Sequence, residues 1–297
     1  MLFLYDHTSI EPIQRVAFTL FGIDVYWYGI CIAIGATLAL LLGLRTAKYL
    51  KVDQNALIDG FLWGLIVGVL GARIWYVIFE WDQYADNPIS IITGFRDGGL
   101  AIHGAVYAAA IYAFIYCKVK KINFIKVLEM LAPGFLIGQI CGRWGNFFNQ
   151  EAHGGLVPGA TLDAQREWLL NHLIPKFITD QMYITDLETG VADQIGYYHP
   201  TFYYEFLWNV VGLTGIFLAR RFWKKYWIGD AAIVYLIWYS IGRFMIEALR
   251  TDSLYVFGLR TAQLTSVIMF VAGVVLLILR RIYRVYPISF CGYKGEA

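Results

Sequence analysis

Charged residues are scarce in this sequence. They form 15% of its 297 residues, whereas 59% are hydrophobic. An ordinary soluble domain carries about 25% charged residues, so a soluble protein of this length would lack the charge to cover its surface. We therefore predict that much of the surface faces lipid. The formal net charge is only +2, which supplies no basic surface, and we expect no nucleic-acid partner.

Cysteines are also few, and they form no CxxC pair: Cys31, Cys117, Cys141 and Cys291. Neither a disulfide framework nor a thiolate metal site is indicated, and we expect these cysteines to be packing residues. The first eleven residues contain Asp6 and Glu11 but no Lys or Arg. A secretory signal begins with a basic segment, so we expect no cleaved signal peptide.

Metal and nucleotide motifs are absent as well. His103, His153 and His199 lack the spacing of zinc ligands, and the acidic residues are not clustered for magnesium. No Gly-rich loop followed by Lys-Ser or Lys-Thr occurs, so ATP is not implied. We expect the protein to use no metal and no cofactor.

What the sequence does contain is long apolar segments. A helix that crosses a bilayer needs about 20 mostly apolar residues, and we find seven candidates: 25–44, 57–79, 99–117, 125–147, 200–219, 229–248 and 262–280. The pattern predicts an all-α, polytopic membrane protein with about seven transmembrane helices in a single transmembrane domain, residues 1–297. Glycines four residues apart, at 64 and 68 and at 134 and 138, indicate close helix packing.

Basic residues gather in alternate connections, which indicates the orientation. Fifteen of the 24 Lys and Arg residues follow spans one, three, five and seven: Arg45, Lys48, Lys51, Lys118, Lys120, Lys121, Lys126, Arg220, Arg221, Lys224, Lys225, Arg280, Arg281, Arg284 and Lys294. Connections rich in Lys and Arg remain cytoplasmic. We predict that the N-terminus is outside and the C-terminus inside, and that residues 151–198 form a small extracytoplasmic cap between spans four and five.

Polar residues recur at one end of six predicted spans. With this orientation, all of them lie in the outer third of the membrane: Tyr28, Arg73, His103, Arg143, Asn146, His199, Glu205, Arg243 and Glu247. Ionisable residues inside a span are costly and usually functional. An arginine near a helix end can also simply reach interfacial water, but short side chains cannot. We expect an internal polar cavity in which arginine binds a phosphate.

The densest polar block is residues 142–154, Gly-Arg-Trp-Gly-Asn-Phe-Phe-Asn-Gln-Glu-Ala-His-Gly. It resembles the signature of the phosphatidylglycerol–prolipoprotein diacylglyceryl transferase family. Other motifs similar to the family's follow in order: Trp27-Tyr28-Gly29, Asp97-Gly98-Gly99 with His103-Gly104, His199-Pro200 with Tyr204-Glu205, and Gly242-Arg243 with Glu247, Arg250 and Asp252. The resemblance covers nearly the whole chain, and it is weakest in the long outer loop.

The resemblance implies a transferase of the bacterial plasma membrane with its active site near the outer leaflet. Such an enzyme moves a diacylglyceryl group from phosphatidylglycerol to the thiol of the lipobox cysteine of a prolipoprotein. Glycerol phosphate is released, and the step is the first in lipoprotein maturation. The expected partners are phosphatidylglycerol, the signal-peptide lipobox and the bilayer.

The chemistry suggests roles for the residues. A thiol with a pKa of about 8.5 needs a base, for which His103 is the candidate; a structural histidine is the alternative. Arg143 and Arg243 would balance the charge of the departing phosphate. Candidate phosphatidylglycerol-binding residues are Tyr28, Arg143, Asn146, Glu151, Gly154, Arg243 and Glu247. Glu247 lies four residues after Arg243 and either orients it or forms a structural ion pair with it.

A further set is expected to support the site or the fold: Arg73, Asp97, Gly98, Gly99, Gly142, Gly145, Asn149, His199, Glu205, Arg250 and Asp252. Two other functions are compatible with buried charges. A transporter would show internal repeats and a site near the midplane, and an intramembrane protease would show a Ser/His pair, paired Asp residues or HExxH. We find no internal repeat, the polar groups gather near one face, and no protease motif is convincingly placed.

Overall fold

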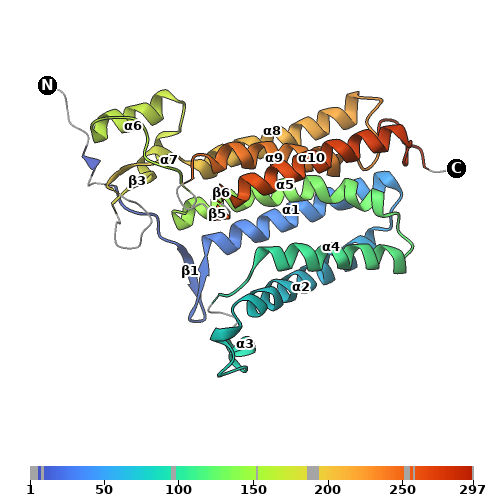
Figure 1. The fold of residues 1–297 in the computed structure, drawn as a ribbon, viewed down its shortest axis with the longest axis horizontal. Helices are drawn as coiled ribbons and strands as arrows, with labels where there is room; N and C mark the ends of the chain where they lie inside the picture. Colours follow the sequence, from blue (N-terminus) through green and yellow to red (C-terminus); the bar gives the residue numbers. More distant parts are fainter. Residues whose placement is uncertain are drawn as a thin grey trace. The chain divides into compact units, whose positions relative to one another are not determined.

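The computed structural model describes residues 6–7, 10–94, 98–151, 153–185, 194–250, 255–256 and 258–295. Long helices dominate this part of the chain (Figure 1): α1 (Trp27–Leu50), α2 (Gln54–Phe79), α4 (Ile102–Val119), α5 (Phe124–Asn149), α8 (Thr201–Phe222), α9 (Asp230–Glu247) and α10 (Thr261–Ile282). Each coincides with a predicted span. The prediction of an all-α polytopic membrane protein is confirmed.

Six of the long helices in the described residues, all except α9, are long and apolar enough to cross a membrane. Helix α9 has 18 residues and contains Asp230, Arg243 and Glu247. Its charges are compatible with a span only if they are buried in protein and paired. The count of seven spans and the orientation therefore stay predictions.

Shorter elements connect these helices. They are β1 (Val16–Leu20), β2 (Ile23–Tyr26), η2 (Trp81–Gln83), α3 (Ser90–Thr93), α6 (Leu162–Asn171), α7 (Lys176–Gln181), β3 (Tyr183–Ile184), β4 (Gly196–Tyr197), β5 (Tyr255–Val256) and β6 (Leu259–Arg260). The strands pair as three antiparallel two-stranded ribbons, β1–β2, β3–β4 and β5–β6. Val16 pairs with Tyr26, Tyr183 with Tyr197, and Tyr255 with Arg260.

Residue contacts divide the chain into two compact units. One comprises 1–39 and 131–291, and the other comprises 40–130 and 292–297. In the second unit α2 packs along α4. A Cβ added to Gly71 would lie 2.7 Å from the carbonyl oxygen of Gly104, and one added to Gly60 would lie 2.9 Å from the Tyr116 ring. Small residues thus allow this close packing. Gly64 and Gly68 face the same helix at ordinary contact distances, 3.5 and 3.9 Å.

In the first unit α9 packs against α8 and α10. Small residues also bring α1 and α5 together, since a Cβ added to Gly35 would lie 3.0 Å from the Cβ of Cys141 and 3.4 Å from the Cα of Gly138. Helix α5 ends where Gln150 takes a left-handed conformation (φ 56°). Helix α9 follows Gly229 (φ 97°), and the Asp230 carboxylate accepts a hydrogen bond from the Trp227 N–H at 2.7 Å.

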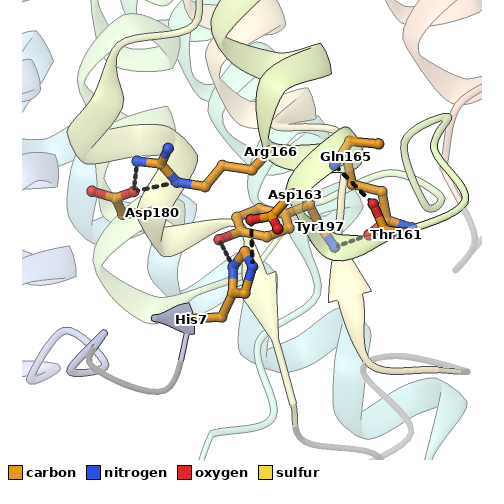
Figure 2. Close-up of polar contacts among 8 residues, drawn as sticks. His7, Thr161, Asp163, Gln165, Arg166, Asp180 and Tyr197 are labelled. Atoms are coloured by element: carbon orange, nitrogen blue, oxygen red, sulfur yellow. Dashed lines mark hydrogen bonds and ion pairs between the residues drawn. The ribbon is translucent and has the colours of Figure 1, made fainter. Parts of the chain in front are cut away.

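Elements α6, α7, β3 and β4, which belong to the predicted cap, gather at one end of α5 and α8 (Figure 1). A buried apolar cluster joins them to these helices: Phe147, Val157, Leu169, Ile174, Ile178, Met182, Tyr197 and Phe202. Figure 2 shows His7 between the Tyr197 hydroxyl at 2.8 Å and the Asp163 carboxylate at 3.1 Å. It also shows Arg166 paired with Asp180 at 2.9 Å. The cap is therefore packed and hydrogen-bonded in its described residues.

Candidate active site

Two arginines and two glutamates from three helices form a continuous ion-pair chain in the first unit. Arg143 of α5 pairs with Glu205 of α8. Glu205 Oε1 lies 3.5 Å from Nη1 of Arg243 on α9, and Arg243 Nη2 lies 2.6 Å from Glu247 Oε2. The structure thus brings together four sequence-predicted site residues. Glu205, expected only to support the site, is the group that joins the two arginines.

Burial separates the acids from the bases in this chain of ion pairs. Glu205 and Glu247 are 6% and 2% exposed, whereas the side chains of Arg143 and Arg243 are each 21% exposed. A buried carboxylate needs a charged or hydrogen-bonding partner, and the arginines supply it. Each guanidinium carries five N–H donors. Part of each arginine therefore remains accessible to a further acceptor.

The end of α5 adds amide and carboxylate groups. Arg143 Nη1 donates to Asn146 Oδ1 at 3.1 Å, and Asn149 Nδ2 donates to Glu151 Oε1 at 2.7 Å. The Glu151 side chain is exposed, and the backbone N–H of Glu151 donates to the Asn146 carbonyl at 2.9 Å. The polar block of the sequence therefore forms two side-chain pairs at the end of α5.

Two glycines of α5 lie beside α1. A Cβ added to Gly145 would lie 2.6 Å from Cδ2 of Tyr28, while one added to Gly142 would reach only Ile32 at 3.7 Å. Gly145 is therefore the position where the Tyr28 ring requires the absence of a side chain. Tyr28 itself is 37% exposed, so the residue is not sealed into the helix interface.

Gly154 lies at a backbone crossing. Its N–H donates to the His199 carbonyl at 2.7 Å, it pairs with Arg250 across a β-bridge, and an added Cβ would lie 2.7 Å from the Leu249 carbonyl oxygen. His199 Nδ1 lies 3.2 Å from the Tyr204 hydroxyl. Burial lowers the pKa of His199, and the nearby His172 lowers it further. These residues connect the start of the cap to the N-terminal end of α8 and the C-terminal end of α9.

Arg73 holds the segment that leads into α4. It is 5% exposed and donates to the carbonyl oxygens of Ser90, Ile91, Gly98 and Gly99. Gly98 and Gly99 have φ of 99° and 75°, a conformation that glycine adopts without strain. This guanidinium is therefore bound to backbone, and the two glycines shape the turn that it holds.

His103 lies exposed in the first turn of α4, and it makes no side-chain hydrogen bond within the described residues. It belongs to the second compact unit. Its assignment as the base stays a prediction. The candidates Asp97 and Asp252 lie outside the described residues.

A small cavity that the sequence did not predict lies beside the ion-pair chain. It is lined by Glu205, Trp208, Asn209, Tyr239, Gly242 and Arg243. Asn209 is 4% exposed. The spacing could have found two of these residues, because Asn209 lies four after Glu205 and Tyr239 lies four before Arg243. Residues four apart share a helix face.

Comparison with known proteins finds relatives over most of the chain. The sequence profile of the family "Prolipoprotein diacylglyceryl transferase" matches residues 15–279. The chain is similar to three curated proteins, each named phosphatidylglycerol–prolipoprotein diacylglyceryl transferase. It is 44% identical to that of Lysinibacillus sphaericus over 91% of this chain and 93% of the relative. The identity is 41% for Oceanobacillus iheyensis (93% and 90%) and 42% for Staphylococcus xylosus (93% and 93%).

The match spans the long helices and the residues of the ion-pair chain, and it confirms the resemblance inferred from the motifs. The apolar helices and the membrane-enzyme relatives agree in making this a multi-pass membrane protein. The chain belongs to the prolipoprotein diacylglyceryl transferase family.

Proposed function

We propose that this chain transfers the diacylglyceryl group of phosphatidylglycerol to the lipobox cysteine of a prolipoprotein, as the first step of lipoprotein maturation. The cysteine thiolate attacks the carbon of the diacylglyceryl group that carries the phosphate ester. A sulfur–carbon bond forms, the carbon–oxygen bond breaks, and glycerol phosphate leaves with the electron pair. The names of the similar proteins state both substrates, and the family match supports the reaction.

The observation that carries the proposal is the sharing of Glu205 by Arg143 and Arg243. Two partly exposed guanidinium groups on either side of one carboxylate keep N–H donors that the glutamates do not use, and these donors can bind an anion of phosphate size. Planar guanidinium groups bind phosphate oxygens in pairs. The arginines would hold the donor phosphate and stabilise the charge that develops as glycerol phosphate departs.

The two glutamates would position these arginines. Glu247 is buried and lies 2.6 Å from Arg243, and a guanidinium fixed by an ion pair need not be ordered when substrate binds. Glu205 would set the spacing of Arg143 and Arg243.

The glycerol headgroup offers hydroxyls, which amide, phenol and carboxylate groups recognise. Asn146, Glu151 and Tyr28 are exposed or partly exposed, and Asn146 already contacts Arg143. We propose that they bind the headgroup next to the phosphate. Gly154 would contribute by keeping the following backbone close to the end of α9.

His103 would accept the thiol proton. A free cysteine has a pKa of about 8.5, so little thiolate exists at neutral pH without a base. Imidazole, with an unperturbed pKa near 6.5, is suited to this task. The exposed position of His103 leaves its ring nitrogens available.

We further propose that the active site lies near the outer leaflet of the bacterial plasma membrane. The reason is the alternation of basic connections along the sequence, which keeps the Lys- and Arg-rich side in the cytoplasm. The end of α5 that carries Arg143 and Asn146 is then at the outer side, where a secreted prolipoprotein arrives.

The test is reconstitution of the purified protein with labelled phosphatidylglycerol and a lipobox peptide. Arg143→Ala should abolish transfer while the protein remains inserted. Arg143→Lys should also lose on the order of 10²–10³-fold in kcat, because a point charge cannot replace the planar donor pair. Arg166→Lys is the matched control, since Arg166 also pairs with a carboxylate, but inside the cap.

Activity of Arg143→Lys close to wild type would exclude paired phosphate contact by Arg143. Absence of labelled peptide with every version of the protein would overturn the proposed reaction itself.

A further inference from the structure

An open basic pocket lies at the C-terminal end of α1, within the second compact unit. It has a volume of about 530 Å³ and is lined by Arg45, Lys48, Tyr49, Lys51, Tyr293 and Lys294. Four of these six residues are cations, and none is acidic. The pocket shares no residue with the candidate active site.

The pocket exists because the C-terminal segment is held against α1. The N–H of Tyr293 donates to the Tyr49 hydroxyl at 3.0 Å, and the two rings lie 6.2 Å apart. Lys126 Nζ lies 5.3 Å from the centre of the Tyr293 ring. These contacts bring Lys294 next to cations 243 or more positions earlier in the chain. Basic residues that lie beside a span only to set its orientation need not be brought together in one pocket.

Four cations around one pocket repel one another unless an anion compensates them. The end of the α1 helix dipole offers only about half a negative charge. The pairing at the candidate active site is different, since each arginine there already has a glutamate. The charge in this pocket is therefore available for a ligand.

We propose that this pocket binds the phosphate headgroup of an anionic phospholipid. Helix α1 is long and apolar enough to span a membrane, so its end lies at the depth of the headgroups. Basic residues at this depth attract anionic lipids, and tyrosines favour the interface because one end of the ring is apolar and the other polar.

Native mass spectrometry of the detergent-solubilised protein can count retained lipids. The probe is phosphatidylserine, because phosphatidylglycerol is the proposed donor and would also bind at the active site. Phosphatidylcholine, which has the phosphate but no net charge, is the control lipid. Wild type should retain phosphatidylserine in preference to phosphatidylcholine.

The variant Arg45→Gln/Lys48→Gln/Lys294→Gln should bind phosphatidylserine on the order of 100-fold more weakly, since each basic side chain near a lipid surface contributes about a fivefold effect. The matched control is Lys121→Gln/Lys224→Gln/Lys225→Gln, which removes three exposed charges outside the pocket. It should bind less than about tenfold more weakly. Equal losses in the two triple variants would overturn the proposal, because they would mean general electrostatic attraction only.

Tyr49→Phe tests the geometry without changing charge. It removes the acceptor that holds Tyr293, so phosphatidylserine retention should fall, by up to about tenfold for one hydrogen bond. Unchanged retention would show that the C-terminal segment does not form the site. A last arm adds inorganic phosphate, and displacement of the lipid at millimolar phosphate would indicate a site for soluble phosphate rather than for lipid.

Discussion

At the scale of single residues, the partners of an arginine separate supporting from reactive roles. Arg73 is 5% exposed and donates to four backbone carbonyls. Arg280 is 8% exposed and pairs with Asp230 at 2.9 Å. Arg143 and Arg243 keep 21% of their side chains accessible. A guanidinium surrounded by fixed acceptors stabilises the fold, whereas a partly open one can bind a substrate anion.

His103→Gln tests the proposed base. Glutamine keeps the approximate size and hydrogen bonding but cannot accept the proton, so kcat should fall about 10²–10⁴-fold. The residual rate should rise with pH toward the pKa of the thiol, because hydroxide takes over the deprotonation. The measurement is the pH profile of transfer. His172→Gln, an exposed histidine of the cap, should keep the wild-type profile.

A wild-type pH profile in His103→Gln, with a loss below about tenfold, would exclude His103 as the base. The residue would then position the substrate or the helix.

His199 should make stability depend on acidity. Burial lowers the pKa of its imidazole, and His172 lowers it further. The folded state therefore resists a proton that the unfolded state accepts below pH about 6.5. The free energy of unfolding should decrease as pH falls through that value. The measurement is thermal unfolding between pH 8 and about 5.

In this pH series the stability of His199→Gln should fall less steeply toward acid pH than that of wild type. His172→Asn should reduce this pH dependence only in part, because burial is the larger cause of the lowered pKa of His199. Stability that falls with pH in His199→Gln as steeply as in wild type, or more steeply, would contradict the assignment.

At the scale of elements, a pair of indoles fixes α8 against α9. Trp208 Nε1 donates to the Trp238 carbonyl at 3.0 Å, Trp238 Nε1 donates to the Trp208 carbonyl at 3.0 Å, and the rings stack at 4.1 Å. Gly242 lies against the Trp208 ring, and Gly212 against the Trp238 ring. The contact is reciprocal, so it sets the distance between the helices that carry Glu205 and Arg243.

Gly242→Ala should disturb this contact. An added Cβ would overlap the Trp208 indole, and overpacking costs about 1–3 kcal/mol. The melting temperature and the transfer rate should both fall. Gly215→Ala on α8 is the control, because nothing lies within 4 Å of its Cβ position; helix propensity should make it neutral or stabilising by up to about 1 kcal/mol.

If Gly242→Ala lowers the melting temperature but keeps the wild-type transfer rate, the indole contact is not what positions the arginine.

At the scale of the whole molecule, the orientation follows from where the basic residues lie along the chain. Asn171→Cys, exposed in the cap, should react with an impermeant thiol reagent from outside intact cells. Lys225→Cys, exposed between α8 and α9, should react only after permeabilisation. Labelling is measured in a background without the four native cysteines. The reverse pattern would invert the predicted topology.

The sequence alone determined the elements and the candidates. Apolar runs set the helices because a span needs a continuous apolar stretch, and each predicted range coincides with a helix. The polar block ending α5 and the pair Arg243–Glu247 could be predicted because their members are local in sequence. The family could be identified for the same reason, since its motifs are short and keep their order.

Only the tertiary structure decided which distant groups meet. Glu205 pairs with Arg143, 62 positions away, and lies 3.5 Å from Arg243, 38 positions away; nothing in either local sequence specifies that choice. No periodicity in the sequence predicts that Trp208 contacts Trp238. The contact depends on Gly242 and Gly212, which leave room for the two rings. The basic pocket likewise needs the C-terminal segment folded back onto α1. Such contacts depend on how helices pack in space, whereas periodicity describes one helix at a time.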